Sequence, residues 1–454
     1  MKIATIDAKQ FRLGESPTEH EAERGFSPET YGLNLLKEKG MMYPSGSKTD
    51  IGSTTLLGKV IAKAKDTSYL GNDQYFLDDE GNFYTYDGTF TKRQTDSVKT
   101  YQLGTSDMIQ FQGNTFATST DDIAMLTSSD LTSIDHDWWS ITKAHGTMDI
   151  GVRHPLEVVE DHLYIGDGNY IHTYDGTTTG YQTIVLPQGV NVISLRKGSD
   201  GRSLLAFCGE TANYSHSLGL SGKVYYIDTV TFAFIKEVKL ESQVEGTINH
   251  EGAVMCTWGK NFGYFDGTGL VWMRDLVSDT TYSHNLESME DTLLIRDSKY
   301  VVAYGDLGKG KVFWKMYIAG DSVDVIAYLG SGKVAIGYLS GSTDYLKYFD
   351  INEVGSVGYF FSNPITLPGK VWIRRIEIEH DKTTAVWNEF PVNYKADDAG
   401  SANITNVSYL SSQTGISRTR LDVNILASIF AVGIQWYNGS LGMRKISIYY
   451  ESAE

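Results

Sequence analysis

The sequence has very few cysteines and prolines. Its 454 residues include only two cysteines, Cys208 and Cys256, and eight prolines. Two cysteines do not make a disulfide framework, and each lies in an apolar run typical of a strand, so we expect two buried free thiols. The low proline count, together with 46 glycines and 29 tyrosines, favours many short strands joined by tight turns over helices.

Long apolar runs and helical periodicity are also missing. No stretch approaches the length of about 20 apolar residues that a membrane span needs. The first 15 residues lack the continuous apolar core of a signal peptide. Only residues 19–23 and 33–39 would pass for a turn or two of helix, and neither has a clear cap and apolar stripe. We therefore expect a soluble protein, synthesised in a cytoplasm and not inserted in a membrane.

Basic residues are outnumbered by acidic ones. The chain has 39 lysines and arginines against 56 aspartates and glutamates, which gives a net charge of −17. A balance of this sign offers no global attraction to DNA, RNA or an anionic membrane surface. We therefore expect no bound nucleic acid, although an acidic surface suits DNA that must slide past without sticking.

What the sequence does have is a recurring phrase, one or two aromatic residues followed by Asp-Gly-Thr. Intact copies contain Asp87, Asp175 and Asp266, and degenerate copies contain Asp130, Asp228, Asp306 and Asp350. Asp-Gly between runs of β-forming residues predicts a tight hairpin turn, because glycine and aspartate tolerate positive φ. The seven aspartates follow one another at intervals of 38 to 53 residues. This period is typical of propeller blades, each a four-stranded sheet.

The fold that we predict is all-β and has three parts. An irregular β-propeller, with seven blades and six or eight as the alternatives, occupies residues 55–362. An N-terminal arm, residues 1–54, either donates a strand that closes the ring of blades or reaches a neighbouring subunit. A small β-sandwich occupies residues 363–454, with strands at residues 372–379, 392–394, 407–409, 419–423, 431–437 and 443–449.

Two of these C-terminal strands echo each other. Each places two isoleucines, two positions apart, directly after a basic pair, which is Arg374-Arg375 in one strand and Arg444-Lys445 in the other. Such alternation gives a strand one apolar and one polar face. The basic pairs are interpreted as part of a solvated face, with docking of a partner as the alternative.

Motifs that would carry catalysis are not found. The sequence has no HExxH, no paired CxxC and no GxSxG. Residues 305–311 (GDLGKGK) have the spacing of a phosphate-binding loop, but Val312 stands where a serine or threonine would hold magnesium. Strand-like runs flank the segment on both sides, so we predict a glycine-rich hairpin turn. The Asp-Gly-Thr phrase also lacks the leading serine and trailing tryptophan of the turn motif found in glycoside-cleaving propellers.

A His-Asp cluster is the most tempting candidate for a metal or acid-base site. It consists of Asp135, His136 and Asp137, followed by His145 and His154. Trp138 and Trp139 beside it indicate instead a strand end that packs into the next blade. Four further acids are interpreted as turn residues that cap backbone amides, with calcium ligation as the alternative: Asp121, Asp122, Asp161 and Asp167. We predict no catalytic residue, no metal and no cofactor.

Residues 24–46 (RGFSPETYGLNLLKEKGMMYPSG) and the two C-terminal strands, with Arg-Arg-Ile-Glu-Ile and Arg-Lys-Ile-Ser-Ile, carry a resemblance. The predicted propeller between these segments lacks the Gly-His and Trp-Asp motifs of WD40 repeats. Taken together, these features resemble the tail hub, or packaged-DNA-stabilising, proteins of short-tailed bacteriophages and the related nozzle proteins. The resemblance implies a virion protein in the tail or head-to-tail junction, without catalytic residues. It also implies a homo-oligomeric ring, expected to be a hexamer, that prolongs the DNA exit channel below portal and adaptor proteins. The arm and the C-terminal domain would be its interface elements.

Two other functions are alternatives at this point. One is a receptor-binding or baseplate protein that holds a host-surface glycan on a concave aromatic cluster, with Tyr214, Trp258 and Trp272 as candidates. The other is a polysaccharide-degrading propeller enzyme. That enzyme would require carboxylates, or a His-Tyr pair, converging at the mouth of the central channel.

Overall fold

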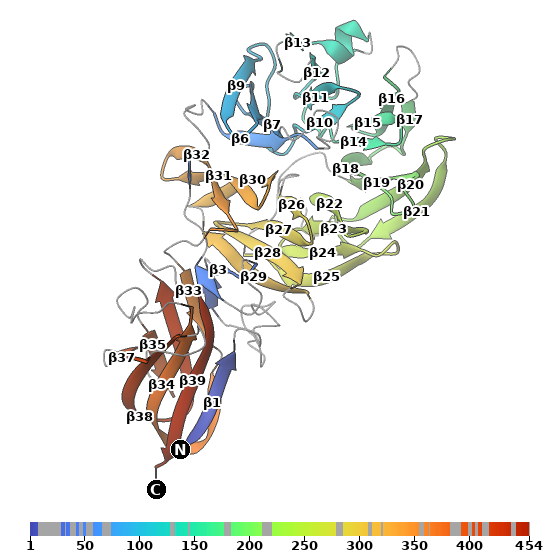
Figure 1. Cartoon of the computed structure of the whole chain (residues 1–454). Coiled ribbons are helices and arrows are strands. Elements are labelled where there is room, and N and C mark those ends of the chain that lie inside the picture. The colour runs from blue at the N-terminus through green and yellow to red at the C-terminus, as the bar shows by residue number, and fades with distance from the viewer. Residues whose placement is uncertain are drawn as a thin grey trace.

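The computed structural model shows a chain made almost entirely of strands (Figure 1). It describes residues 1–7, 29–31, 33–36, 42–44, 49–50, 58–65, 74–127, 131, 133–143, 146–176, 183–210, 220–277, 285–306, 311–318, 321–353, 358–362, 364–381, 392–397, 402–404, 407–410, 417–436 and 442–453. Within these ranges a single π-helical turn, Trp138–Thr142, accompanies 39 strands. None of the described helical structure is long and apolar enough to cross a membrane.

Seven antiparallel sheets of four strands form the propeller, as predicted. Blade 1 has β6 (Val60–Lys63), β7 (Gln74–Asp78), β8 (Asn82–Tyr86) and β9 (Phe90–Thr95). Blade 2 has β10 (Met108–Phe111), β11 (Asn114–Thr118), β12 (Ile123–Thr127) and β13 (Ser133–Asp135). Blade 3 has β14 (Leu156–Val159), β15 (His162–Asp167), β16 (Tyr170–Tyr174) and β17 (Thr183–Val185).

The other four blades follow in chain order. Blade 4 has β18 (Asn191–Lys197), β19 (Ser203–Gly209), β20 (Gly222–Asp228) and β21 (Phe234–Leu240). Blade 5 has β22 (Gly246–His250), β23 (Ala253–Trp258), β24 (Asn261–Phe265) and β25 (Leu270–Asp275). Blade 6 has β26 (Leu286–Met289), β27 (Thr292–Asp297), β28 (Tyr300–Asp306) and β29 (Lys311–Ile318). Blade 7 has β30 (Ser322–Gly330), β31 (Lys333–Ser340), β32 (Thr343–Asp350) and the N-terminal strand β5 (Thr49–Asp50).

Strand β5 closes the ring. It pairs antiparallel with β32, with Thr49 opposite Tyr348 and Asp50 opposite Lys347. The last blade is therefore completed by a strand from the start of the chain, which confirms the first of the two interpretations of the N-terminal segment.

The Asp-Gly-Thr phrase marks the end of the third strand of a blade. Asp87, Asp175 and Asp266 directly follow β8, β16 and β24, and Asp228, Asp306 and Asp350 end β20, β28 and β32, whereas Asp130 lies outside the described residues. Asp87 Oδ1 accepts the amide of Thr89 at 3.0 Å, and Gly88 has φ of +109°. Only the glycine has positive φ, so the turn is an aspartate-capped loop rather than a two-residue type I′ turn, which needs positive φ at both positions.

The C-terminal domain is a single sheet of nine strands and not two separate sheets, as a sandwich would have. Its main path is β1 (Lys2–Asp7), β39 (Met443–Ser452), β34 (Ile365–His380), β38 (Ser417–Trp436), β33 (Gly358–Phe361) and β2 (Glu29–Tyr31), with β35 (Val392–Ala396), β36 (Ala402–Ile404) and β37 (Val407–Leu410) joined beside it. The predicted strands at 419–423 and 431–437 are one strand of 20 residues, β38. Because partners pair along both sides of β38, they share one hydrogen-bonded sheet.

Two predicted boundaries are wrong. The described part of residues 1–54 is not a separate arm, because β1 and β2 belong to the C-terminal sheet and β5 belongs to the propeller. A short hairpin of β3 (Leu33–Asn34) and β4 (Tyr43–Pro44) lies between them in sequence. Strand β33, predicted as propeller, also belongs to the C-terminal sheet, so the described propeller ends with β32.

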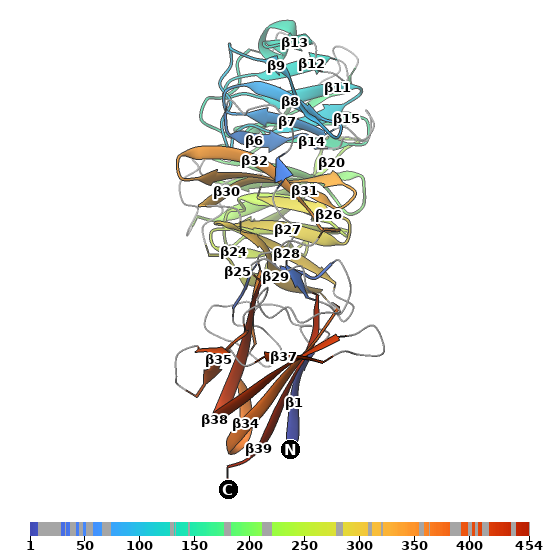
Figure 2. The same ribbon diagram turned by 60° about the vertical axis from the view of Figure 1, so that its left-hand side comes forward.

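The propeller and the C-terminal sheet share one apolar core. A single cluster of buried side chains runs from blades 6 and 7, with Trp314 and Val323, into the C-terminal sheet, with Ile373 and Trp436. Strands β2 and β3 lie against β29 at this junction. Figures 1 and 2 show the long strands of the C-terminal sheet extending from this edge of the propeller. Continuous burial of this kind favours a rigid relation between the two parts.

Candidate functional site

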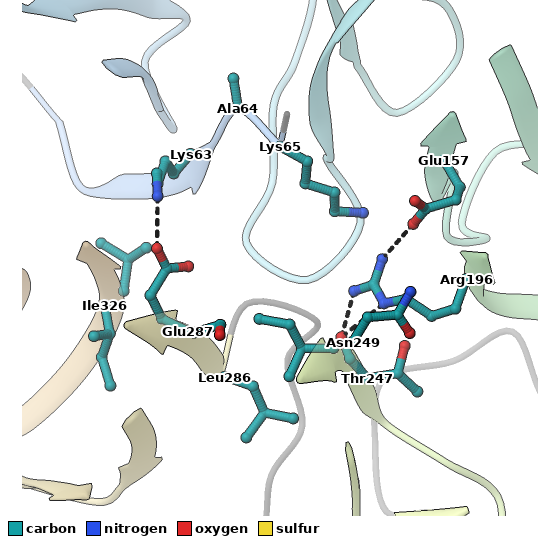
Figure 3. Close-up of a pocket in the computed structure, with 13 residues that line it drawn as sticks. Lys63, Ala64, Lys65, Glu157, Arg196, Thr247, Asn249, Leu286, Glu287 and Ile326 are labelled. Atoms are coloured by element: carbon teal, nitrogen blue, oxygen red, sulfur yellow. Dashed lines mark hydrogen bonds and ion pairs between the residues drawn. The ribbon is translucent and has the colours of Figure 1, made fainter. Parts of the chain in front are cut away.

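The first strands of the blades surround a cavity of about 360 Å³ on the axis of the propeller. Its walls come from β6, β14, β18, β22, β26 and β30 and from the residues next to β6. Apolar side chains form part of this wall, but ion pairs between different blades dominate it (Figure 3). These charged side chains stand in strands whose other residues pack into the blades.

The first ion pair joins blade 1 to blades 6 and 7. Lys63 Nζ lies 2.5 Å from Glu287 Oε1 and donates to the carbonyl of Tyr328 at 3.1 Å. The same oxygen of Glu287 accepts the amide of Tyr328 at 2.8 Å. Each side chain of the pair is about one-sixth exposed. The pair therefore ties three blades together on the side of the ring where β5 closes it.

The second ion pair joins blades 3, 4 and 5. Arg196 Nη1 lies 2.8 Å from Glu157 Oε2, and Arg196 Nε donates to the carbonyl of Thr247 at 3.0 Å. Nη2 also donates to the carbonyl of Thr247, and Nη1 donates to that of Leu195 at 3.0 Å. The guanidinium is thus fixed by three blades at once.

Lys65 lies between these two pairs. Its ammonium contacts Asp107 and donates to the carbonyl of Leu156 at 3.0 Å. Asp107 in turn accepts the amide of Leu156 at 2.9 Å. Burial lowers the pKa of Lys65, and the nearby carboxylate of Asp107 opposes this shift. In Figure 3 the lysine reaches toward the side of the cavity on which Arg196 and Glu157 lie.

Two more pairs stand at the beginnings of the inner strands. Lys59 Nζ lies 2.8 Å from Asp324 Oδ1, and Arg153 Nη2 lies 2.9 Å from Glu245 Oε2. Burial raises the pKa of Asp324, while the hydrogen bond from Lys59 lowers it. Together with the three pairs above, these five cations and five carboxylates cancel, so these ten residues contribute nothing to the net charge of −17. The space that they leave on the axis admits only a small molecule.

Acids from two of the predicted groups, Asp137 from the His-Asp cluster and Asp121 and Asp122 from the turn residues, converge on a lysine. Lys99 Nζ lies 2.8 Å from Asp137 and 3.2 Å from Asp122, and Asp121 is 3.7 Å away. Burial lowers the pKa of Lys99, but the hydrogen bonds to Asp137 and Asp122 outweigh it and raise the pKa above its ordinary value. The ammonium thus takes the central place that a metal ion would have had in the calcium alternative for Asp121 and Asp122 or in the metal alternative for Asp137.

The tryptophans beside this cluster are structural, as predicted. Asp122, which is fully buried, accepts the amide of Ser140 at 3.1 Å and so fixes the π-helical turn. This turn holds Trp138 and Trp139 in the core. Of the other members, Asp135 accepts the hydroxyl of Thr142 at 2.7 Å and His136 pairs with Asp96 at 2.9 Å, whereas His145 lies outside the described residues.

The remaining acids behave as local structure. Asp161 lies in the turn between β14 and β15. Asp167 accepts the amide of Asp149 at 2.9 Å, and His154 and His172 lie 3.5 and 3.8 Å from it. No group of three or more histidines, cysteines or carboxylates among the described residues is placed to hold a metal ion.

The structure also shows the places of the phosphate-loop lookalike, the two cysteines and the basic pair Arg374-Arg375. Asp306 pairs with Lys311 across β28 and β29, so the phosphate-loop lookalike joins two strands of a hairpin. Cys208 and Cys256 are free and buried, and burial raises the pKa of both thiols. Arg374 pairs with Glu451 at 2.6 Å and Arg375 with Glu377 at 3.3 Å on the polar side of the C-terminal sheet.

The described aromatic residues that were predicted to form a glycan-binding cluster lie in different environments. Trp258 is buried between blades 4 and 5, whereas Trp272 stands on the outer strand β25 with nearly half of its surface exposed. Trp272 Nε1 donates to Asp275 at 3.0 Å. Tyr214 lies outside the described residues. The described members therefore sit in different environments, one in the core and one on the rim.

Sequence reasoning missed the axial cavity. Lys63 and Glu287 are separated by 224 residues, so no local spacing links them. A signal was nevertheless present, because a charged residue stands inside the first strand of several blades: Glu157 in LEVV, Arg196 in NVISLRK and Glu287 in LESM. A charge in a strand buried on both faces needs a partner, and the partner here comes from another blade.

Comparisons with known proteins give structural similarities of low identity and no match by sequence. No protein-family model and no curated protein sequence matches the chain. The crystal structure of the computationally designed Ika8 protein is similar over 69% of this chain and 96% of its own, with 10% identity and a TM-score of 0.41. A chain in the crystal structure of a mitotic checkpoint complex is similar over 73% of this chain and 96% of its own, with 10% identity and a TM-score of 0.44.

Proposed function

We propose that this protein is a structural subunit of a bacteriophage virion, a tail hub or nozzle component. Several copies, expected to be six, form a ring that prolongs the DNA exit channel below the portal and adaptor. The proposal begins from the resemblance of residues 24–46 and of the paired C-terminal strands. Three features of the subunit support it.

The outer rim of the propeller carries the observation on which the proposal rests most. Large apolar side chains are about half exposed on the fourth strands of three consecutive blades: Val185 on β17, Phe234 and Ile235 on β21, and Trp272 on β25. Exposed apolar side chains grouped in this way are typical of protein interaction surfaces. A ring of identical subunits needs such a surface, in contact with a different surface of the next copy.

The closed axis of the propeller is the second supporting feature. A cavity of about 360 Å³ crossed by ion pairs cannot pass a DNA duplex. In this proposal the channel for DNA is therefore the hole at the centre of the ring of subunits, and not the axis of any one propeller.

The distribution of charge is the third feature that supports the proposal. Because the ten axial charges cancel, the whole excess of 17 negative charges belongs to the rest of the chain. Acidic walls repel the phosphate backbone, so that DNA passes without binding tightly.

Interface variants test the proposal. Phe234→Glu combined with Ile235→Lys places charges on the outer rim of blade 4 and should convert rings to monomers in mass photometry. Val98→Lys is the matched control, because Val98 is at least as exposed as Phe234 and Ile235 but lies in the loop after β9 of blade 1. A wild-type protein that stays monomeric with and without portal and adaptor, or that binds duplex DNA tightly at physiological salt, would overturn the proposal.

A further inference from the structure

Three cations in the axial cavity keep a hydrogen-bond donor in reserve. An ammonium has three N–H donors and a guanidinium has five. Lys63 uses two, to Glu287 and the carbonyl of Tyr328, and Lys65 uses two, to Asp107 and the carbonyl of Leu156. Arg196 uses four. Within the described residues, each of the three cations therefore has one N–H left for another acceptor.

Three side chains of the lining also have an oxygen that accepts no hydrogen bond from the described residues. Glu157 uses only Oε2 and Glu287 only Oε1 in their contacts with the described chain. Asn249 donates through Nδ2 to the carbonyl of Lys197 at 3.0 Å, which leaves its Oδ1 for a donor. Asn249 is also the exposed member of the lining, so it marks the mouth of the cavity.

Much of the rest of the wall is apolar. Leu286 and Ile326 are buried side chains on β26 and β30 that line the cavity on the side of Glu287, and Val325 on β30 is also buried and part of the lining. The volume of about 360 Å³ is at the lower end of the range for small-molecule sites. Such sites usually combine apolar side chains with converging polar groups, and this cavity has both, with a large share of charged groups.

The lining carries three cations and two carboxylates, because Asp107 lies in the smaller recess behind Lys65. With Asp107 counted as the partner of Lys65, the charges around the cavity balance, so the spare N–H groups of Lys65 and Arg196, and not an excess of positive charge, are what the cavity offers to an anionic acceptor. Lys65 and Arg196 lie close enough for Arg196 to lower the pKa of Lys65, after the larger effect of burial. An anionic group between these two cations would relieve their repulsion.

We propose that the axial cavity binds a sugar acid of one or two residues. Its carboxylate accepts hydrogen bonds from Lys65 and Arg196, its hydroxyls donate to Glu157, Glu287 and Asn249, and one face of the ring packs against the apolar wall. A neutral sugar offers the spare N–H groups of Lys65 and Arg196 only uncharged acceptors, and a phosphate brings a second negative charge near Glu157. The inference uses the cavity alone and is independent of the ring proposed above.

Calorimetric titration with glucuronate, glucose and glucose 6-phosphate is the first test. We expect glucuronate to bind at least tenfold more tightly than glucose, as the gain of a hydrogen bond between charged groups predicts. Equal affinities for glucuronate and glucose, tighter binding of the phosphate, or no glucuronate binding at millimolar concentration would each overturn the proposal.

Two variants locate the site. Lys65→Met and Asn249→Ala should each weaken glucuronate binding, the first by at least tenfold. Lys311→Met is the control, since that lysine pairs with Glu251 on the rim of blades 5 and 6, away from the axis. If the thermal melt shows that Lys65→Met does not fold, the affinity of Asn249→Ala for glucuronate alone tests the location of the site. Asn249 is exposed, so its replacement should leave the fold intact. Unchanged affinity in the folded variants would contradict the assignment.

A sugar acid can be free or the terminal residue of a surface polysaccharide. Titration with a disaccharide and a longer oligosaccharide that both end in glucuronate separates these sources. If the oligosaccharide binds as well as the monomer, the mouth at Asn249 admits a chain end and a glycan is the ligand. If only the free acid and the disaccharide bind, the ligand is a soluble metabolite. Ring formation by the same variants should be unchanged, so failure of this inference leaves the ring proposal intact.

Discussion

Arg153 and Glu245 form a buried ion pair between blades 3 and 5. Arg153 Nη2 lies 2.9 Å from Glu245 Oε2, and Nη1 donates to the carbonyl of Glu245 at 2.5 Å. The two residues are 92 positions apart, and both side chains are at least 95% buried. They stand just before β14 and β22, so the pair links the inner strands of two blades that are not neighbours in sequence.

Removing one member of this pair should destabilise the propeller strongly. Arg153→Ala leaves the Glu245 carboxylate buried without its cation, which we expect to lower the free energy of unfolding by about 3–5 kcal/mol. Chemical denaturation followed by tryptophan fluorescence measures the change. The double variant Arg153→Met with Glu245→Leu should recover most of the loss, because it removes both charges. A loss below about 1 kcal/mol for Arg153→Ala would mean that the pair is not buried as described.

The pairing of β5 with β32, which closes the ring of blades, should control the stability of blade 7. Alternate residues of an antiparallel strand donate to the neighbouring strand, so changing both Thr49 and Asp50 to proline removes the donor whichever residue carries it. We expect faster hydrogen exchange in β32 and a lower melting temperature. A chain that begins at residue 8 is the control, since it loses β1 of the C-terminal sheet and keeps β5. Unchanged exchange in β32 of the proline variant would show that the ring closes in another way.

Lys99 should be essential to the acid cluster at blade 2. Lys99→Met leaves Asp121, Asp122 and Asp137 without their common cation, and we expect a loss of about 2–3 kcal/mol at pH 7. The loss should be constant from pH 7 up to the ordinary lysine pKa of 10.5 and shrink at higher pH, because the raised pKa of Lys99 gives a stabilisation that disappears once the ammonium is deprotonated. Lys99→Arg is the conservative control. Melting curves of the three proteins across this pH range test the prediction, and a loss independent of pH would contradict it.

Two buried histidines should make the protein less stable in mild acid. Burial lowers the pKa of His154, although Asp167 opposes the shift, and burial also lowers the pKa of His250. Below the ordinary value of 6.5 the unfolded chain therefore binds protons that the folded chain does not. The free energy of unfolding should fall from pH 7 to pH 5, by at most about 1.4 kcal/mol per pH unit for each histidine.

His154→Gln isolates one of these contributions. Because glutamine does not titrate, the variant should show a shallower dependence on pH over the same range. Denaturation midpoints at pH 5, 6 and 7 provide the comparison with the wild-type chain. An identical slope in the two proteins would show that His154 does not contribute.

The repeats were predictable from the sequence because their signals are local. Asp87 and Asp266 each stand beside the glycine that their turn requires. Counting all seven copies of the motif, intact and degenerate, predicted the seven blades that the structure has. The echoed isoleucines of the C-terminal strands were also informative. Ile376 pairs with Ile448 and Ile378 with Ile446, so the two similar segments are direct neighbours in the sheet.

Pairings between distant segments were not predictable in the same way. The axial pair of Lys63 and Glu287 depends on how seven blades close into a ring, which no local pattern specifies. The same holds for β1, whose six residues gave no sign that they pair with β39 at the other end of the chain. The sandwich was predicted because two short strands were counted where one long strand, β38, crosses the whole domain.

The measurement that tests the proposed function most directly is mass photometry with negative-stain imaging of the purified protein, alone and with the portal-adaptor complex of its source particle. We predict rings of six subunits with an axial hole, and capture of those rings by the connector. A monomer or trimer at micromolar concentration that ignores the connector would contradict the tail hub assignment.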